Sequence, residues 1–287
     1  MGWDGFLLLW CAAWGVAALV GYGMSLAGVT KAQRTVRLAG RIERVREPRH
    51  GGSRTGGISV VVSYRDPVTG EQITVTNDGE RGEMITVAWE GREIGVSHPR
   101  GRPHAYRLFN VPEEPSRGLG WPTFAVFLVY VGLVVLAAVD RGWPWALIGF
   151  GGPWAVYAAV HLPATIRARN DHVARLAAME TAEGSVVAVL KDVSVDQDDG
   201  HTWTTITPVV SFTTREGTVV TAHCTEKLPN AAEARGRDVT VHYAPADPAH
   251  FTLNRSAEQR SRNQDVTFNV LTIVVLAATA VVGVAFL

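Results

Sequence analysis

Four possible zinc ligands lie in the second half of the chain: His223, Cys224, His242 and His250. Zinc prefers imidazole and thiolate ligands, and a structural site arranges four of them around one ion. His223 and Cys224 are neighbours in an expected strand, and neighbouring residues of a strand point to opposite faces of a sheet. Because these two side chains diverge, we expect no bound metal and no other cofactor.

A glycine-rich stretch, GGSRTGG at residues 51–57, has the composition of a phosphate-binding loop. It lacks the Gly-Lys-Ser/Thr ending that brings a lysine to phosphates and a hydroxyl to Mg²⁺. The sequence also lacks a signature of an activated nucleophile, such as Gly-x-Ser-x-Gly. We therefore expect this stretch to be a hairpin loop. We expect no catalytic and no cofactor-binding residues, and a protein that is not an enzyme.

Two loops at equivalent places in the two halves of the chain carry opposite charges. The candidate contact residues are Arg46, Arg49 and Arg54 in the first loop and Asp192, Asp196 and Asp198 in the second. The acidic run does not fit a calcium loop, because its glycine is misplaced and no glutamate closes it. We predict that the loops contact one another, within a chain or between chains. Two solvated loops are the alternative, since an exposed ion pair contributes only about 0–1 kcal/mol.

The segments that carry these loops occur twice. Residues 91–108, GREIGVSHPRGRPHAYRL, align without a gap with residues 236–253, GRDVTVHYAPADPAHFTL. The motif VVSY at residues 61–64 is matched by VVSF at residues 209–212. The repeat residues that we expect to have structural roles are Gly91, Val96, Pro103, Gly236, Val241, Tyr243, Pro245 and Pro248. We infer two copies of one unit that share a fold.

Both copies show the pattern of β-strands, because short apolar runs alternate with polar residues and end at Gly, Pro or Asp. We expect two small all-β modules of five to six short strands each, within residues 30–120 and 184–256. Residues 84–89 are one candidate strand of the first module. Each module could be a barrel or a sandwich. A module this small needs help to bury a core and to cover its edge strands.

Four apolar segments contain no Asp, Glu, Lys or Arg and are long enough to cross a bilayer as helices. They are residues 6–29, 121–139, 143–162 and 266–287. Residues 163–183 are rich in helix formers and should extend the third span as a helical stalk. Basic residues, which stay in the cytoplasm, gather next to both β modules. We therefore expect a multipass protein of the cell (plasma) membrane, with cytoplasmic β modules and both termini outside.

The pattern G-R-x-V-x-V-x-Y-x-P-x-x-P is best preserved in the second copy. Its residues there are Gly236, Val239, Val241, Tyr243, Pro245 and Pro248. Together with V-V-S-[YF] and a neighbouring apolar span, this pattern resembles the bacterial membrane family called domain of unknown function 3592, present as two tandem copies. The first copy departs from the pattern, with His98 for the tyrosine and Arg100 for the first proline. The family implies no activity, cofactor or catalytic residue.

These patterns predict a kind of molecule and no particular reaction. We expect a non-enzymatic membrane scaffold or interaction protein that displays duplicated β modules in the cytoplasm. Its partners would be the lipid bilayer and either a second copy or another membrane or cytoplasmic protein, and not nucleic acid. A membrane enzyme subunit is one alternative, and it would need titratable side chains that converge in a cleft. A component of a small-solute transporter or channel is another, and it would need a polar path through the spans.

Overall fold

The computed structural model describes residues 3–54, 57–77, 82–114, 116–195, 201–226 and 228–287. By its internal contacts the chain divides into two compact units. The helical unit comprises Met1–Gln33, Ser116–Arg175 and Ser256–Leu287, and the β unit comprises Arg34–Pro115 and Leu176–Arg255. Each unit is therefore assembled from segments that are far apart in the sequence.

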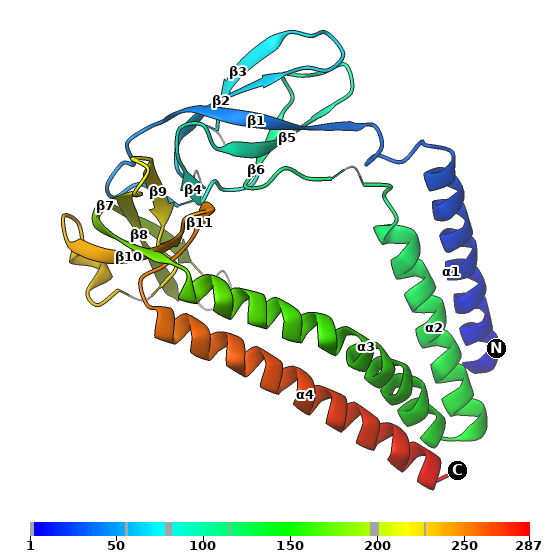
Figure 1. The fold of residues 1–287 in the computed structure, drawn as a ribbon. Coiled ribbons are helices and arrows are strands. Elements are labelled where there is room, and N and C mark those ends of the chain that lie inside the picture. The colour runs from blue at the N-terminus through cyan, green and yellow to red at the C-terminus, as the bar shows by residue number, and fades with distance from the viewer. Residues whose placement is uncertain (1–2, 55–56, 78–81, 115, 196–200, 227) are drawn as a thin grey trace. The chain divides into compact units, whose positions relative to one another are not determined.

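The helical unit consists of long helices (Figure 1). They are α1 (Trp3–Leu26), α2 (Gly120–Arg141), α3 (Pro144–Ala177) and α4 (Arg255–Ala285). Among the described residues, three stretches are long and apolar enough to cross a membrane, namely Trp3–Leu26, Gly120–Arg141 and Val266–Ala285. This composition is compatible with a membrane protein. The expected third span, residues 143–162, lies in α3. It is not among these stretches, because Pro, Trp, Tyr and His lower its mean hydropathy.

Small residues bring neighbouring helices close together, as is common in membranes. A Cβ added to Gly132 of α2 would lie 2.6 Å from the Cys11 sulfur of α1. A Cβ added to Gly151 of α3 would lie 2.9 Å from the Leu276 carbonyl oxygen of α4. Large apolar side chains elsewhere on the helices are exposed, for example Leu19 of α1 (74 %) and Phe268 of α4 (70 %). Such surfaces suit a lipid environment, where apolar exposure costs little.

The first half of the chain forms a five-stranded antiparallel sheet. Its strands are β1 (Thr35–Val45), β2 (Val60–Arg65), β3 (Gln72–Thr76), β5 (Glu93–Pro99) and β6 (Arg107–Phe109), in the order β3-β2-β1-β5-β6. Ile42, Ile94 and Leu108 are fully buried in its core. The Glu83 N–H donates to the Leu108 carbonyl (2.7 Å) and the Ile58 N–H to the Ile85 carbonyl (2.8 Å). The first bond covers the edge of β6 and the second joins residue 85 to the segment before β2, so the sheet comes close to a barrel.

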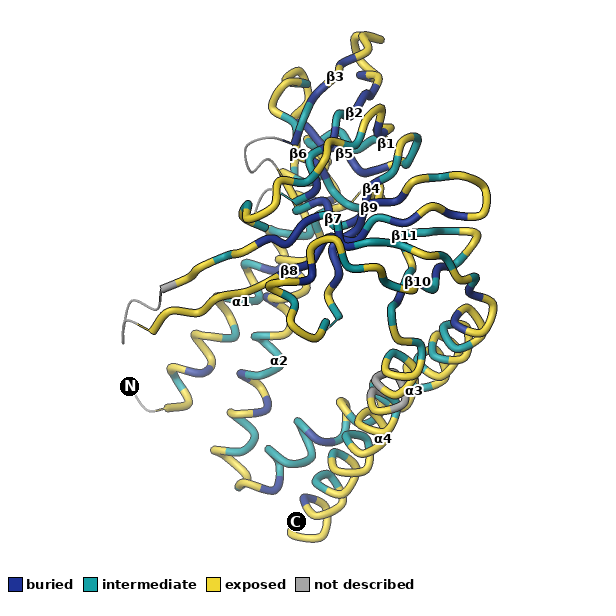
Figure 2. Tube along the Cα trace, turned by 90° about the vertical axis from the view of Figure 1, so that its left-hand side faces the viewer, coloured by how far each residue is buried: buried dark blue, intermediate teal, exposed yellow. Residues whose placement is uncertain are grey.

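The second half forms a six-stranded antiparallel sheet with a short helix beside it. Its elements are β7 (Glu180–Val195), β8 (Thr202–Thr213), β9 (Val219–His223), the 3₁₀ helix η1 (Ala231–Glu233), β10 (Asp238–Ala244) and β11 (Asp247–Thr252). The strand order is β11-β10-β7-β8-β9-β4, where β4 is Val87–Ala88. Figure 2 shows that the strands carry most of the buried residues, whereas the helices are largely exposed or intermediate.

The two sheets have the same connectivity. Read from β4, the second order is β9-β8-β7-β10-β11, which matches β3-β2-β1-β5-β6 strand for strand. A register shift occurs between Ile42 and Arg44 in β1 and between Val186 and Ala188 in β7. The extra residue of such a bulge bends and twists the strand. The two sheets are therefore curved at corresponding places.

Strand β4 corrects one expectation from the sequence. Residues 84–89 were expected to add a strand to the first module, but Val87 and Ala88 pair with Ala222 and Thr221 of β9. The side chain of Val87 is buried in the second core, whereas Ala88 is buried in the first. Arg92 donates a hydrogen bond to the Val87 carbonyl. Two residues carry no measurable periodicity, so only contacts across the chain could assign this strand.

Two element boundaries also differ from the expectations. The predicted stalk at residues 163–183 is helical only to Ala177, because β7 starts at Glu180 and pairs there with Tyr243 of β10. The last helix starts at Arg255, well before the apolar span expected at residues 266–287. Its first turns are polar and are built from good helix formers such as Glu258 and Arg260, so the helix extends beyond the apolar segment.

Candidate functional site

The residues that follow β1 lie along β7 of the second sheet. The Gly51 N–H donates to the Val189 carbonyl (2.9 Å), and the Lys191 N–H donates to the Gly52 carbonyl (3.0 Å). The Val189 N–H donates to the His50 Nδ1 (3.2 Å). Strand β10 pairs with β7 only as far as Ser185. Beyond Ser185 the loop therefore pairs with the edge of β7 in place of β10. This pairing reduces the number of unpaired backbone groups.

Asp192 of β7 holds the next part of this loop. Its carboxylate accepts hydrogen bonds from the Ser53 hydroxyl (2.5 Å) and from the Arg54 backbone N–H (3.0 Å). The Arg54 Nε lies 3.9 Å from the second carboxylate oxygen. The carboxylate therefore binds mainly through hydrogen bonds, with a partly exposed ion pair as a smaller contribution.

The other four candidate contact residues are not shown in the contact between the loops. Arg46 and Arg49 line a cavity beside this contact. Asp196 and Asp198 lie outside the described residues. Of the six candidate contact residues, the structure thus places Arg54 and Asp192 together.

The cavity beside this contact has a volume of about 590 Å³. It is lined by Arg46, Glu47, Pro48, Arg49, Gly52, Ser53, Gly57, Ser59, Asn77, Leu190 and His223, and we call it the His223 cavity. Asn77 is buried and bonds to the backbone of Val60 and Ile58, which makes it part of the wall. The other buried polar side chain is His223 at the end of β9, which is 4 % exposed. Neither nitrogen of its ring has a hydrogen-bond partner among the described residues.

The environment keeps His223 neutral. Burial, and to a smaller degree the positive charge of Arg54, lower the pKa of its imidazole to about 4 against the opposing effect of Asp192. At neutral pH the ring therefore offers one N–H donor and one nitrogen acceptor. A poorly basic imidazole is better suited to binding a molecule through hydrogen bonds than to removing a proton from it.

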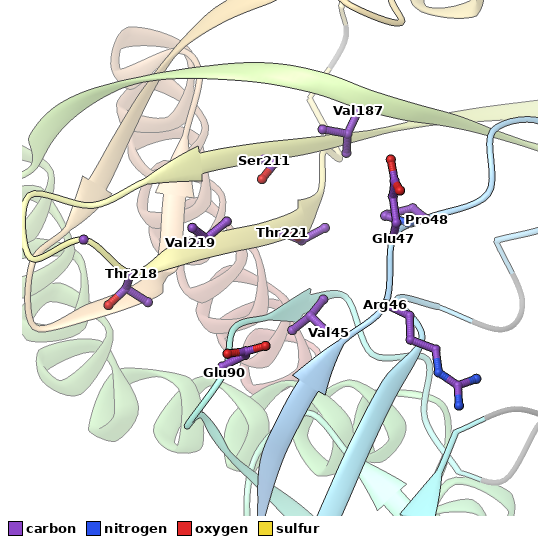
Figure 3. A pocket seen from close by; sticks show the side chains of 11 residues that line it. Val45, Arg46, Glu47, Pro48, Glu90, Val187, Ser211, Thr218, Val219 and Thr221 are labelled. Atoms are coloured by element: carbon purple, nitrogen blue, oxygen red, sulfur yellow. The ribbon is translucent and has the colours of Figure 1, made fainter.

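A second cavity of about 540 Å³ is also lined by residues 46–48 (Figure 3). Its walls include the carboxylates of Glu47 and Glu90 and the hydroxyls of Ser211, Thr218 and Thr221. Figure 3 shows Glu47 pointing toward Val187, whereas Arg46 points away from it. Neighbouring residues of an extended chain point in opposite directions. Arg46 and Glu47 nevertheless belong to the lining of both cavities.

The four residues considered as zinc ligands are not brought together. Cys224 is buried in the second core, whereas His223 lines the cavity named after it. The Nδ1 of His242 lies 3.2 Å from the Thr181 hydroxyl, and the Nδ1 of His250 lies 3.0 Å from the Asp247 carboxylate. Within the described ranges, no group of three or more His, Cys, Asp or Glu side chains is arranged to hold a metal ion.

The glycines of the repeat motif occupy equivalent turns. Gly91 has φ of 89° and Gly236 has φ of 77°, a conformation that a side chain disfavours. The Gly91 N–H donates to the Ile42 carbonyl and the Gly236 N–H to the Val186 carbonyl, both at 2.8 Å. Each turn therefore fastens the strand that follows it to the bulge region of β1 or β7.

The valines of the motif explain a second pair of glycines. A Cβ added to Gly40 would lie 2.7 Å from the Val96 side chain, and one added to Gly184 would lie 3.2 Å from the Val241 side chain. Val96 and Val241 are 1 % and 0 % exposed. Glycine at these places in β1 and β7 lets the valine of the neighbouring strand fill the core.

Tyr243 and His98 show how the modules differ at corresponding buried positions. The Tyr243 hydroxyl accepts a hydrogen bond from the Arg215 N–H (2.8 Å) and donates one to the Glu180 carboxylate (3.0 Å). In the first module the Nε2 of His98 lies 3.9 Å from the Asp66 carboxylate. Backbone hydrogen bonds, chiefly from Val68, hold the pKa of the Asp66 carboxyl below its usual range. The tyrosine thus binds the preceding hairpin through hydrogen bonds, whereas the histidine only lies close to it.

The prolines of the motif have separate roles. The Pro103 carbonyl accepts a hydrogen bond from the Tyr64 hydroxyl (2.7 Å). Pro245 is exposed in the turn between β10 and β11. Pro248 lies in β11, which is an edge strand beside β10 among the described strands. Proline is tolerated there because an edge strand has one side that needs no N–H donor.

Sequence reasoning did not identify the His223 cavity or the role of the histidine in it. His223 entered only as a possible zinc ligand. The one available signal was the strand alternation, which places His223 and Thr221 on the face opposite to Ala222. What covers that face is decided by residues more than one hundred positions away.

The comparison with known protein families gives one match. The model of the domain of unknown function 3592 matches residues 182–258, which include most of the second sheet. The match lies in the second half of the chain, and the first half is not part of it. No curated protein and no solved structure matches the chain significantly.

Proposed function

We propose that this protein is a multipass membrane scaffold whose two duplicated β modules act as one rigid interaction body. The observation that carries this proposal is strand β4, which leaves the first half of the chain to pair with β9 of the second. Hydrogen bonds from Gly51 to Val189 and from Ser53 to Asp192 add to the junction. Two sheets joined in this way present their surfaces in a fixed geometry, which suits the positioning of a partner.

Duplication is supported by the equal strand order, the bulges at corresponding positions and the two Gly-Arg turns. We extend the family match at residues 182–258 to the first half of the chain on these grounds. A second copy of the unit supplies the cover that each small sheet needs for its edge strands. The unmatched first half is then the diverged copy, in a protein of bacterial origin.

The shared β unit also bears on the number of spans. Its two segments lie in the same compact body, so they lie on one side of the membrane. The chain between them must then cross an even number of times. Three helices, α2 among them, are apolar enough to span, so we propose that α3 spans as well and that the protein has four spans. The basic residues beside the β segments support the proposal that the body lies in the cytoplasm and that both termini lie outside.

Cysteine accessibility tests this topology. Thr74 and Thr213 are exposed in the two sheets, and Asp140 lies near the turn between α2 and α3. In a Cys11→Ser background, a membrane-impermeant maleimide should label Asp140→Cys from outside intact cells and label Thr74→Cys and Thr213→Cys only after permeabilisation. Labelling of only one of the two β positions from outside would exclude a joint β body on one side of the membrane.

Crosslinking in the native membrane tests the scaffold function. Crosslinks from the β unit to a second copy or to another protein, lost when the β4 and β9 pairing is disrupted by Ala88→Pro, are the expected result. Proline removes the backbone donor and the strand geometry that this pairing uses. If the β unit yields no intermolecular crosslink in cells that express the protein, the scaffold proposal is wrong.

A further inference from the structure

The His223 cavity contains a feature that a scaffold does not explain. His223 is buried at the end of β9, and neither ring nitrogen has a protein partner in the described parts of the chain. Its backbone is well held, since its N–H donates to the Thr86 carbonyl at 2.7 Å. A buried polar group without a partner destabilises the folded state, so such groups are normally satisfied by protein, water or ligand. The cavity has the size of a small-molecule site.

The charges around the cavity favour an anion. Arg46 and Arg49 line it, and the guanidinium group of Arg54 is close enough to lower the pKa of His223. Two acidic groups lie near these arginines: Glu47 also lines the cavity, and Asp192 already accepts hydrogen bonds from Ser53 and Arg54. In Figure 3 the carboxylate of Glu47 points toward Val187, whereas Arg46 points away from it. Among these described groups the three arginines outnumber the two carboxylates, which leaves an excess of positive charge.

We propose that the His223 cavity binds a small organic anion that carries a carboxylate or a phosphate group. Arg46 and Arg49 attract the anionic group, since guanidinium groups bind carboxylates and phosphates through paired hydrogen bonds. His223 supplies a neutral donor and acceptor to the same molecule. Pro48 and Leu190 form apolar parts of the wall and accommodate a short carbon skeleton.

The neutral state of His223 makes the site selective. A protonated imidazole would bind any anion nonspecifically, whereas a neutral ring needs a partner of suitable geometry. A cation is disfavoured by the arginines, and a fully apolar molecule would leave both ring nitrogens without a partner. The site therefore combines long-range attraction by charge with short-range selection by hydrogen bonds. The proposal does not depend on the scaffold function, because it concerns a ligand within the β unit.

The test uses the full chain in lipid nanodiscs with isotope-labelled histidine. The His223 ring signal is assigned by its loss in His223→Leu and is then followed during titration with inorganic phosphate, acetate and, as a neutral probe, glycerol. We expect a saturable shift with phosphate, acetate or both, and none with glycerol. Saturation by phosphate alone assigns a phosphate ligand, and saturation by acetate alone assigns a carboxylate.

Matched variants separate binding from the general effect of salt. Arg46→Gln with Arg49→Gln should weaken the apparent affinity by at least about tenfold, since each lost charge-assisted contact is worth a factor of this order. Arg100→Gln with Arg102→Gln removes the same charge at two exposed positions elsewhere in the β unit and should leave the affinity unchanged. An unsaturable shift, no shift with either anion, or equal affinities in both double variants would overturn the proposal and leave a water-filled cavity.

A stability measurement covers the case in which the ring signal is too broad to follow. Phosphate stabilises folded proteins in general, so only the difference between variants is informative. Phosphate or acetate should raise the thermal unfolding temperature of the wild type more than that of His223→Leu. The leucine variant itself should fold, because it removes a buried polar group and keeps an apolar side chain of similar size. Equal increases in both proteins would contradict the anion site.

Discussion

If the two sheets form one cooperative body, a mutation that destabilises the first core should also increase the opening of the second core. Ile94 of β5 is fully buried in the first core, and Cys224 is buried in the second. Replacing a buried isoleucine by alanine costs about 2–5 kcal/mol, from lost burial and the cavity left behind. If β4 couples the sheets, this cost applies to the unfolding of both. The opening equilibrium at Cys224 would then rise about 30-fold to several thousand-fold, at about 1.4 kcal/mol per factor of ten.

Thiol labelling under native conditions measures this opening. Cys224 is 3 % exposed, and burial raises the pKa of its thiol, so it reacts only when the core opens. The experiment uses a Cys11→Ser background, in which Cys224 is the remaining cysteine. Ile94→Ala should accelerate the labelling of Cys224 by the factor above. Ile94→Val, which costs about 0.5–1.5 kcal/mol, should accelerate it only about 2- to 10-fold.

A reporter in the first core defines the result that would refute this reasoning. Val62 of β2 is fully buried there, so Val62→Cys reports the opening of the first sheet. Faster labelling at Val62→Cys together with an unchanged rate at Cys224 would show that the sheets unfold independently. The hydrogen bonds of β4 and of residues 51–54 would then be contacts without cooperative effect, and the scaffold proposal would lose its rigid body.

Three further predictions address single sites. For His223, the unfolded chain takes up a proton below pH 6.5 while the folded protein does so only near 4, so stability should fall by about 3 kcal/mol as pH decreases through this window; urea unfolding across this range should show a flatter profile for His223→Leu, and parallel profiles would contradict a buried neutral ring. Gly184→Ala should cost about 1–3 kcal/mol, because the new Cβ would lie 2.8 Å from the Ser211 carbonyl oxygen; an unchanged midpoint in chemical denaturation would show that β7 moves aside at little cost. Asp192→Ala should cost about 1–3 kcal/mol by removing the acceptor for Ser53 and Arg54, whereas Arg54→Gln should cost at most about 1 kcal/mol because that ion pair is partly exposed; equal costs in thermal unfolding would assign the contact to the ion pair.

Much of the β unit follows from local sequence. The alternation in VVSY and VVSF places Val62 and Val210 in their cores, as period-two patterns require. The Gly-Arg turns at Gly91 and Gly236 follow from the need for positive φ. Because both halves carry similar turns and strands in the same order, the sequence predicts two small all-β modules, and the structure has two antiparallel sheets. The apolar composition of α1, α2 and α4 likewise indicates possible spans without any tertiary information.

The tertiary structure decides how the two sheets are connected. Strand β4 is too short for a periodic signal, and its assignment depends on the free edge of β9. The loop at residues 51–54 finds its hydrogen-bond partners in Val189 and Asp192, more than one hundred positions later. His223 is a surface or a buried residue depending on whether that loop covers it. Such contacts depend on the packing of whole elements, so local composition predicts the sheets, and only their packing creates the cavity between them.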